Sequence, residues 1–315
     1  MAEERLAWLF PGQGAQEVGM GRDLFDGSGA ARRVFETADS VLGYAISDLC
    51  FQGPAERLRE TQHAQPAIFA TSLACLEAAR ELGGIAPEPP AVVAGHSLGE
   101  YTALVAAGAL ELEDGLRLVA ERGRLMQQAG QRTPGVMAAL LGLDEDTGVE
   151  ICRETGAEIC NLNAPGQLVV GGAAQDVEAA MRLALERGAR RGVLLKVSAA
   201  FHTSHMASAA EEMARAVADT PLRDPQVPII ANTTAEPLTT AAALRGELVE
   251  QLTRPVQWQR SVEELRSQRV TSVIEFGPGR VLTGLVRRID RSLAIRNVTD
   301  LASARSQATP SPTPP

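Results

Sequence analysis

The stretch Ala91-Val92-Val93-Ala94-Gly95-His96-Ser97-Leu98-Gly99-Glu100 places a serine between an apolar run and a helical pattern that reaches about Ala107. The apolar run predicts a short strand. Gly-x-Ser-x-Gly between a strand and a helix is the pattern of a nucleophile elbow, a sharp turn that exposes the serine hydroxyl. A helix N-terminus also favours negative charge nearby. We therefore predict that Ser97 is a nucleophile and that the Leu98 amide is an oxyanion donor. The alternative is a packing turn without chemistry.

Short aliphatic runs like the one before the elbow recur along the chain and alternate with amphipathic helical stretches. This alternation is typical of an α/β fold with a mainly parallel sheet. The runs that predict its strands are Leu6 to Phe10, Ala91 to Ala94, Val227 to Ala231 and Thr271 to Phe276.

Residues 133–197 follow a different order, strand-helix-strand-strand-helix-strand, which is that of a ferredoxin-like unit. Because α/β patterns resume afterwards, we predict an inserted ferredoxin-like small subdomain and a discontinuous large subdomain, 1–132 and 198–301. A cleft is expected between them. Residues 302–315 lack large apolar side chains and are predicted to be a disordered tail. The predicted elements of the insert are strand 136–141, helix 144–155, strand 158–162, strand 167–170, helix 174–187 and strand 192–197.

Composition excludes several classes of protein. The chain has 315 residues, 45% of them hydrophobic, and a formal net charge of -9. This acidic balance argues against nucleic acid or an anionic membrane as partners. No apolar run approaches the ~20 residues of a membrane span, and Leu6 to Phe10 is too short for a signal peptide. The cysteines lack C-x-x-C spacing, so we expect reduced thiols and a cytoplasmic protein; they are Cys50, Cys75, Cys152 and Cys160.

A serine nucleophile needs a base within hydrogen-bond reach, and the chain has four histidines. His202 follows a predicted strand at the subdomain junction and is the favoured base. His205, one turn further on, is the weaker option. We interpret His63, in a predicted loop before a helix, and His96, on the elbow, as structural.

No acid completes a Ser-His-Asp set in an obvious way. The aspartates between the serine and the histidine lie at predicted helix starts, where N-capping accounts for them. We therefore expect a group other than a carboxylate, such as a backbone carbonyl, to orient the histidine, and this weakens the hydrolase interpretation. The aspartates concerned are Asp144, Asp146 and Asp176.

A second glycine-containing turn, Gly12-Gln13-Gly14, follows the first predicted strand. A dinucleotide-binding G-x-G-x-x-G would need glycine at position 17, where the chain has Glu17. We therefore reject a dinucleotide cofactor.

Several motifs together resemble the malonyl-CoA:acyl carrier protein transacylases, over roughly residues 6 to 299. Their number and order are far more specific than any one of them. The motifs are Phe10-Pro11-Gly12-Gln13-Gly14-Ala15-Gln16, Gly95-His96-Ser97-Leu98-Gly99-Glu100-Tyr101, Glu121-Arg122-Gly123-Arg124-Leu125-Met126-Gln127, Asn161-Leu162-Asn163-Ala164-Pro165-Gly166-Gln167, Ala200-Phe201-His202, Gln251-Leu252-Thr253-Arg254-Pro255-Val256-Gln257-Trp258 and Glu275-Phe276-Gly277-Pro278-Gly279.

The resemblance implies an α/β-hydrolase-like large subdomain and a ping-pong transfer of malonyl from malonyl-CoA to the phosphopantetheine thiol of an acyl carrier protein. It implies that Ser97 is acylated, that His202 is its base and that the carbonyl of Gln251 orients His202. It also implies an oxyanion hole made by the amides of Gln13 and Leu98. No metal or redox cofactor is then needed, and the phosphopantetheine is carried by the partner.

Two further residues acquire a role through the resemblance. Arg122 matches the malonate-binding arginine of the family, and a planar guanidinium can hold a carboxylate through two hydrogen bonds. Without the motif, Arg122 would be interpreted as a surface arginine on the predicted helix Glu113 to Gln128. Phe201 is bulky, and it should narrow the pocket against branched acyl groups such as methylmalonyl.

The resemblance implies an acyl carrier protein as the partner but leaves the pathway open. Acyl carrier proteins are typically acidic, so the enzyme should present a local basic surface. Fatty acid and polyketide synthesis both stay open, as do a serine thioesterase or esterase acting on acyl-CoA or acyl-carrier thioesters and a catalytically inactive docking protein. We expect a monomer. Candidate docking residues are Arg187, Arg190, Arg191, Lys196, Arg287, Arg288 and Arg291.

Overall fold

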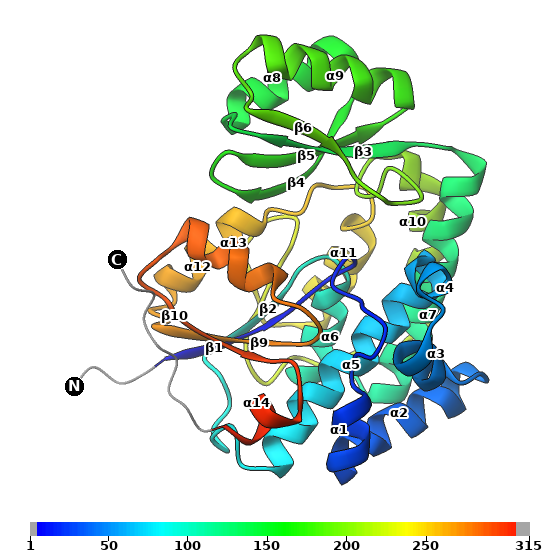
Figure 1. Ribbon diagram of the computed structural model, residues 1–315, viewed down its shortest axis with the longest axis vertical. Helices are drawn as coiled ribbons and strands as arrows, with labels where there is room; N and C mark the ends of the chain where they lie inside the picture. Colours follow the sequence, from blue (N-terminus) through cyan, green and yellow to red (C-terminus); the bar gives the residue numbers. More distant parts are fainter. Residues whose placement is uncertain (1–4, 307–315) are drawn as a thin grey trace.

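The computed structural model describes residues 5–306, which form two sheets (Figure 1). Sheet A has six strands in the order β10-β9-β1-β2-β7-β8. All neighbouring pairs are parallel except β7 and β8. Its strands are β1 (Leu6–Phe10), β2 (Val92–Gly95), β7 (Ile229–Ile230), β8 (Pro237–Leu238), β9 (Ser272–Phe276) and β10 (Ala294–Val298).

Both faces of sheet A are buried, which explains why its strands are apolar runs without polar alternation. In β1, Trp8 and Phe10 enter one hydrophobic core while Ala7 and Leu9 enter a second core on the opposite face. The second core is covered by α12 (Trp258–Ser267) and α13 (Val281–Ile289). The first is covered by α1 (Arg22–Gly27), α2 (Gly29–Leu42), α3 (Ile46–Gln52), α4 (Ala55–Arg59), α5 (Thr61–Glu81), α6 (Leu98–Ala106), α7 (Leu112–Arg132), α10 (Ala207–Asp219), α11 (Ala241–Glu250) and α14 (Leu301–Arg305).

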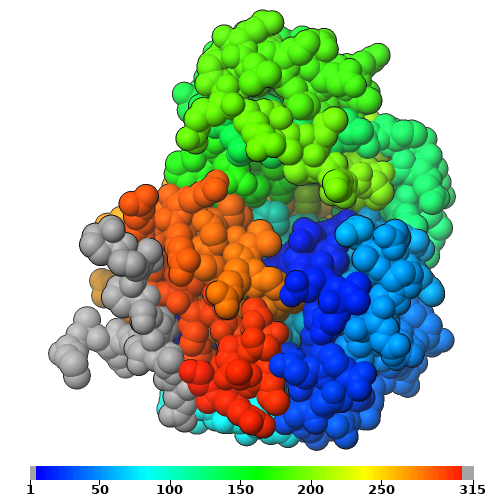
Figure 2. Space-filling view, viewed as in Figure 1, coloured from blue at the N-terminus to red at the C-terminus, as the bar shows by residue number. Residues whose placement is uncertain are grey.

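The second sheet, sheet B, is antiparallel, with the order β4-β5-β3-β6, and has its own core under two helices. The order along the chain, β3-α8-β4-β5-α9-β6, is the one predicted, and the fold class is confirmed. In Figure 2 this small subdomain lies above the larger one. The boundaries at 133 and 197 stay predictions. Its elements are β3 (Val136–Leu141), α8 (Glu145–Thr155), β4 (Glu158–Ala164), β5 (Gln167–Gly172), α9 (Ala174–Glu186) and β6 (Arg191–Leu194).

Direct contacts join the two parts of the molecule. The Leu162 amide in β4 donates to the Val256 carbonyl at 2.9 Å, and the Val256 amide donates to the Cys160 carbonyl at 2.9 Å. These bonds attach sheet B to the segment that precedes α12. A side-chain hydrogen bond between His96, directly after β2, and Asn163 of β4 places the small subdomain at the carboxyl edge of sheet A, where ligands bind in open α/β sheets.

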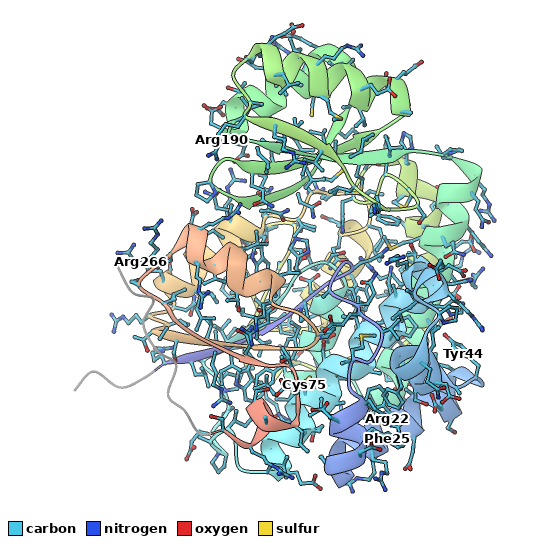
Figure 3. All side chains as sticks on the ribbon, in the orientation of Figure 1. Arg22, Phe25, Tyr44, Cys75, Arg190 and Arg266 are labelled. Carbon is cyan, nitrogen blue, oxygen red and sulfur yellow. The ribbon has the colours of Figure 1, made fainter. Side chains whose placement is uncertain are left out.

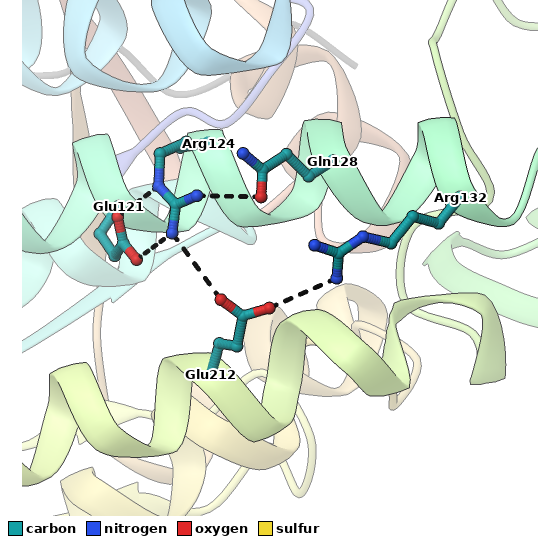
Figure 4. Close-up of polar contacts among 5 residues, drawn as sticks. All are labelled: Glu121, Arg124, Gln128, Arg132 and Glu212. Atoms are coloured by element: carbon teal, nitrogen blue, oxygen red, sulfur yellow. Dashed lines mark hydrogen bonds and ion pairs between the residues drawn. The ribbon is translucent and has the colours of Figure 1, made fainter.

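A surface ion-pair network connects helices α7 and α10. Glu212 of α10 lies between Arg124 (3.8 Å) and Arg132 (3.4 Å) of α7 (Figure 4). Arg124 also pairs with Glu121 at 2.5 Å and donates to Gln128 at 2.9 Å. Because these groups are solvent-exposed, the network contributes only about 1 kcal/mol or less per pair.

At the C-terminal end one prediction fails and one strand was not predicted. The disordered tail predicted for 302–315 is wrong for residues 302–305, which lie in α14. Asp300 and Ser303 cap each other's backbone at the start of α14, and Ala304 is fully buried. Residues 307–315 lie outside the described part of the chain. Strand β10 was missed because Arg296 and Asn297 interrupt its apolar pattern.

Among residues 5–306, no helix combines the length and the apolar character that crossing a bilayer requires.

Candidate active site

The nucleophile elbow forms where the sequence predicts it, between β2 and α6. Ser97 has φ 52° and ψ -106°, a conformation that costs a non-glycine residue about 1–3 kcal/mol. A Cβ on Gly99 would lie 2.0 Å from the carbonyl oxygen of Phe10, and one on Gly95 would lie 1.9 Å from the Gly99 carbonyl carbon. Only glycine fits at these two positions, so the Gly-x-Ser-x-Gly pattern is a steric requirement of this turn.

His202 faces the serine and is oriented by a backbone carbonyl. The distance from Ser97 Oγ to His202 Nε2 is 2.8 Å, and that from His202 Nδ1 to the Gln251 carbonyl oxygen is 2.7 Å. Since a carbonyl can only accept, Nδ1 carries the proton and Nε2 is left to accept from the serine hydroxyl. Gln251 follows α11, and the last carbonyls of a helix lack helical partners and carry partial negative charge. The helix end thus stands where the acid of a Ser-His-Asp set would be, in line with the expected backbone carbonyl.

His202 is neutral at physiological pH. Burial, followed by the nearby Arg122 cation, lowers the pKa of His202 to about 3. Nε2 is therefore unprotonated at neutral pH and free to accept a hydrogen bond from the Ser97 hydroxyl.

The same shift predicts acid sensitivity of the fold. Unfolded His202 takes up a proton below its ordinary pKa of about 6.5, whereas the folded residue stays neutral until about pH 3. The unfolded state therefore binds more protons in this window, and the free energy of unfolding should fall by up to about 1.4 kcal/mol per pH unit below 6.5. Urea unfolding of wild type and His202→Gln at pH 7.5, 6 and 5 measures this. We expect the free energy of unfolding to depend less steeply on pH in the variant than in wild type. Equal slopes would contradict the lowered pKa of His202 in the folded protein.

Arg122 lies beside the nucleophile, not on the surface. It is 1% exposed, and its Nη2 donates to Ser97 Oγ at 3.1 Å. Its guanidinium lies over the Tyr101 ring, 5.1 Å from the centroid. Among residues 5–306, no aspartate or glutamate forms an ion pair with it. A buried cation without an acidic partner is costly to maintain, and it provides a ready counter-charge for an incoming carboxylate.

The two predicted oxyanion donors are the backbone amides of Gln13, in the loop after β1, and of Leu98, directly after Ser97. A Cβ on Gly12 would lie 2.4 Å from the His96 carbonyl oxygen, so the loop after β1 packs directly against the elbow. The Gln13 amide, in that loop, makes no hydrogen bond to another of the described residues. Leu98 is the first residue of α6, so its N–H has no helical acceptor.

Asn232 is a site residue that sequence analysis missed. Its Oδ1 accepts from the Ser97 amide at 2.6 Å and its Nδ2 donates to the Gly95 carbonyl at 2.7 Å, so one side chain fixes both ends of the strained turn. Its own amide donates to Glu100 Oε1 at 3.0 Å. Burial and the neighbouring Glu247 raise the pKa of Glu100. The available clue was that Asn232 follows a predicted strand, and therefore lies at the same sheet edge as Ser97.

The remaining candidates lie around this centre. His96 Nε2 bonds Asn163 Oδ1 of β4 at 3.0 Å, which ties the elbow to the small subdomain. His63 lies in the first turn of α5, not in the predicted loop, and contacts the Tyr44 hydroxyl at 3.3 Å. Phe201 is buried next to the base, at 6% exposure.

Comparison with known proteins identifies the family. The model of the acyl transferase domain matches residues 7–308. The malonyl CoA-acyl carrier protein transacylase of Bacillus subtilis is 43% identical over 301 residues, which cover 94% of each chain. A crystal structure of an acyl carrier protein S-malonyltransferase from Vibrio cholerae has a TM-score of 0.90 at 40% identity, covering 95% of this chain and 98% of that one.

A second solved structure shows a relative with its partner. It is a malonyl-transacylase in complex with a type II PKS acyl-carrier protein, with a TM-score of 0.91 and 39% identity, covering 96% of this chain and 98% of that one. The chain therefore belongs to the acyl transferase domain family and, within it, to the malonyl CoA-acyl carrier protein transacylases.

Proposed function

We propose that this enzyme transfers a malonyl group from malonyl-CoA to the pantetheine thiol of an acyl carrier protein through an acyl-Ser97 intermediate. The observation that carries the proposal is the placement of Ser97 Oγ, 2.8 Å from His202 Nε2 and 3.1 Å from Arg122 Nη2. The first contact activates a nucleophile for acyl transfer. The second supports binding of a carboxylate-bearing acyl group, because it brings a buried cation without an acidic ion-pair partner among residues 5–306 next to the proposed site of acylation.

In the first half-reaction, Ser97 Oγ attacks the thioester carbonyl while His202 Nε2 takes the hydroxyl proton. The amides of Gln13 and Leu98 donate to the oxyanion of the tetrahedral intermediate. The carbon-sulfur bond then breaks, and protonated His202 gives its proton to the departing coenzyme A sulfur. The developing imidazolium is stabilised by the Gln251 carbonyl at the C-terminus of α11.

In the second half-reaction, the thiol of the carrier's phosphopantetheine attacks the malonyl-serine through the same steps in reverse. His202 takes the thiol proton and returns it to Ser97 Oγ. These steps use only side chains and amides of this chain, so we propose that the enzyme has no metal or redox cofactor and that the pantetheine arm comes with the partner. The buried Phe201 next to the base is proposed to select against branched acyl groups.

A serine thioesterase or esterase shares the elbow but is not favoured, because it gives no reason for a buried arginine at the nucleophile. Coenzyme A release separates the two functions. With malonyl-CoA alone, release should stop after about one equivalent, and holo-carrier protein should make it continuous. Continuous release without carrier would identify a hydrolase.

We also propose a pathway, a cellular location and an oligomeric state for the enzyme. The same chemistry serves fatty acid and polyketide synthesis, and both are retained for this chain. The four cysteines are free and buried. This supports a cytoplasmic enzyme, and we propose that it acts as a monomer.

The carrier is proposed to dock on the basic side of the small subdomain. Arg190, Arg191 and Lys196 are exposed there, whereas Arg187 is engaged with Glu150 and Glu154 (Figure 3 labels Arg190). Arg287, Arg288 and Arg291 on and after α13 are exposed and stay candidates.

Reversing the charge of Arg190, Arg191 and Lys196 together should raise the carrier KM about 10-fold, because the partner is acidic and complementary charges govern encounter. The rate of Ser97 malonylation by malonyl-CoA should stay unchanged. Arg266→Glu, an exposed charge reversal on α12, is the matched control. An unchanged carrier KM in the triple variant removes this docking surface.

A further inference from the structure

Arg122 is held in position by two neutral side chains, Gln65 of α5 and Gln251 after α11. Arg122 Nη1 donates to Gln65 Oε1 at 2.8 Å, and Nη2 donates to Gln251 Oε1 at 2.7 Å. Both glutamines are buried, with exposures of 1% and 0%. Each of the two terminal nitrogens of the guanidinium is therefore held by a side-chain amide oxygen, one from α5 and one from the residue that follows α11.

The orientation of the Gln251 amide is determined by its surroundings. Its Nε2 donates to the Ser97 carbonyl at 3.0 Å and to a carboxylate oxygen of Glu100. If the amide were flipped, its NH₂ would face the Arg122 NH₂ group and its oxygen would face two acceptors. The Gln251 side chain thus links the arginine to the nucleophile turn, while its backbone carbonyl independently orients His202.

Neutral acceptors orient a guanidinium without cancelling its charge. A carboxylate in either position would form a charge-assisted, bidentate pair with Arg122, and would compete with the carboxylate of a substrate. Glutamate and glutamine have nearly the same shape, so charge is the principal difference between them. The two side chains that accept from Arg122 Nη1 and Nη2 beside Ser97 are amides. The buried Glu100 carboxyl is hydrogen-bonded to Gln251 Nε2 and not to Arg122. Burial, followed by Glu247, raises the pKa of this carboxyl, which favours its neutral form.

We propose that Gln65 and Gln251 are specificity-determining positioning residues, whose neutral amides hold Arg122 in place and leave its charge for the carboxylate of the acyl group. This inference rests on the proposed malonyl transfer. It predicts that selectivity for malonyl over acetyl depends on the neutrality of residues that do not touch the reacting carbonyl.

Gln65 is the residue to test, because among residues 5–306 its side chain hydrogen-bonds Arg122 and Met126 but neither Ser97 nor His202. Gln65→Glu adds a charge at constant shape, and Gln65→Met removes the acceptor without adding one. The ratio of malonyl to acetyl adduct on Ser97 is measured by intact mass after brief exposure to an equimolar mixture of malonyl-CoA and acetyl-CoA. A hydrogen bond to a charged group contributes about 1.5–3 kcal/mol, which corresponds to roughly 10- to 100-fold. Gln65→Met removes one of the two neutral acceptors and should give the lower end of this range or less, whereas the competing negative charge in Gln65→Glu should give the upper end.

We expect the malonyl-to-acetyl ratio to fall about 100-fold in Gln65→Glu and about 10-fold or less in Gln65→Met. Equal falls in the two variants, or an unchanged ratio in Gln65→Glu, would overturn the inference. Gln251→Met is the second variant. It should also lower the malonyl-to-acetyl ratio, because Arg122 loses the acceptor for its Nη2. The backbone carbonyl of residue 251 is unchanged by the substitution and still orients His202. A wild-type enzyme that loads no malonyl would instead contradict the proposed function itself, so the two failures are distinguishable.

Discussion

Replacing His202 with alanine is expected to lower the rate of Ser97 malonylation by about 10⁴-fold. Positioned general bases contribute about 10²- to 10⁴-fold, and the upper end applies here because His202 is the only base within hydrogen-bond reach of Ser97 Oγ among residues 5–306. Single-turnover intact-mass measurements with malonyl-CoA give the rate directly. The loss should appear equally with acetyl-CoA, because the base acts on the serine and not on the acyl group.

His205 supplies the control for this prediction. It lies in the short helix η1 (Ser204–Met206), and its side chain forms no hydrogen bond with Ser97 among the described residues. From the sequence, it is the weaker candidate base. His205→Ala should acylate within a few-fold of wild type. If His202→Ala acylates within 10-fold of wild type, or if His205→Ala is the slower variant, the assignment of the base is wrong.

Replacing Arg122 with alanine should lower malonyl loading about 100-fold or more while acetyl loading falls less than 10-fold. Removing one partner of a buried, hydrogen-bonded charge pair costs about 2–5 kcal/mol, and only the malonyl group carries the second partner. Rates of Ser97 acylation measured separately with the two thioesters provide the comparison. The selectivity of the variant should therefore move towards acetyl.

Arg117→Ala is the matched control, since Arg117 lies on the same helix with its side chain 61% exposed. It should leave both loading rates near those of wild type. An equal loss of malonyl and acetyl loading in Arg122→Ala would mean that the arginine only supports the fold of the site, for instance through its contact with Ser97 Oγ. Thermal unfolding of the variant separates that case from global destabilisation.

Local pattern was enough to predict most of the fold. Strand β1 coincides with the predicted run Leu6 to Phe10, and helix α8 begins directly after Asp144, whose side chain caps it by accepting from the Thr147 amide at 2.8 Å. These elements have strong periodicity or clear caps. Strand β10 has neither, because Arg296 and Asn297 interrupt its apolar pattern and its position depends on pairing with β9. Helix α14 has a local cap, Asp300 with Ser303, but its five residues are too few to show a periodicity.

The site was predictable where chemistry leaves a local motif. Ser97 is marked by its glycines and His202 by its place after a predicted strand at the subdomain junction, whereas Arg122 is marked only by a motif shared with a family. Gln65 and Glu100 lie within helices and resemble ordinary helical polar residues in the sequence. Their burial and their contacts depend on segments far away in the chain, such as the loop with Asn232 and the end of α11.

The most direct test is the intact mass of the wild-type protein after brief exposure to malonyl-CoA, followed by addition of holo acyl carrier protein. The account predicts a single malonyl adduct that maps to Ser97 by peptide mass analysis, is absent in Ser97→Ala, and moves to the carrier thiol when the carrier is added. No adduct on Ser97, or an adduct that is lost to water as fast as to the carrier, would contradict it.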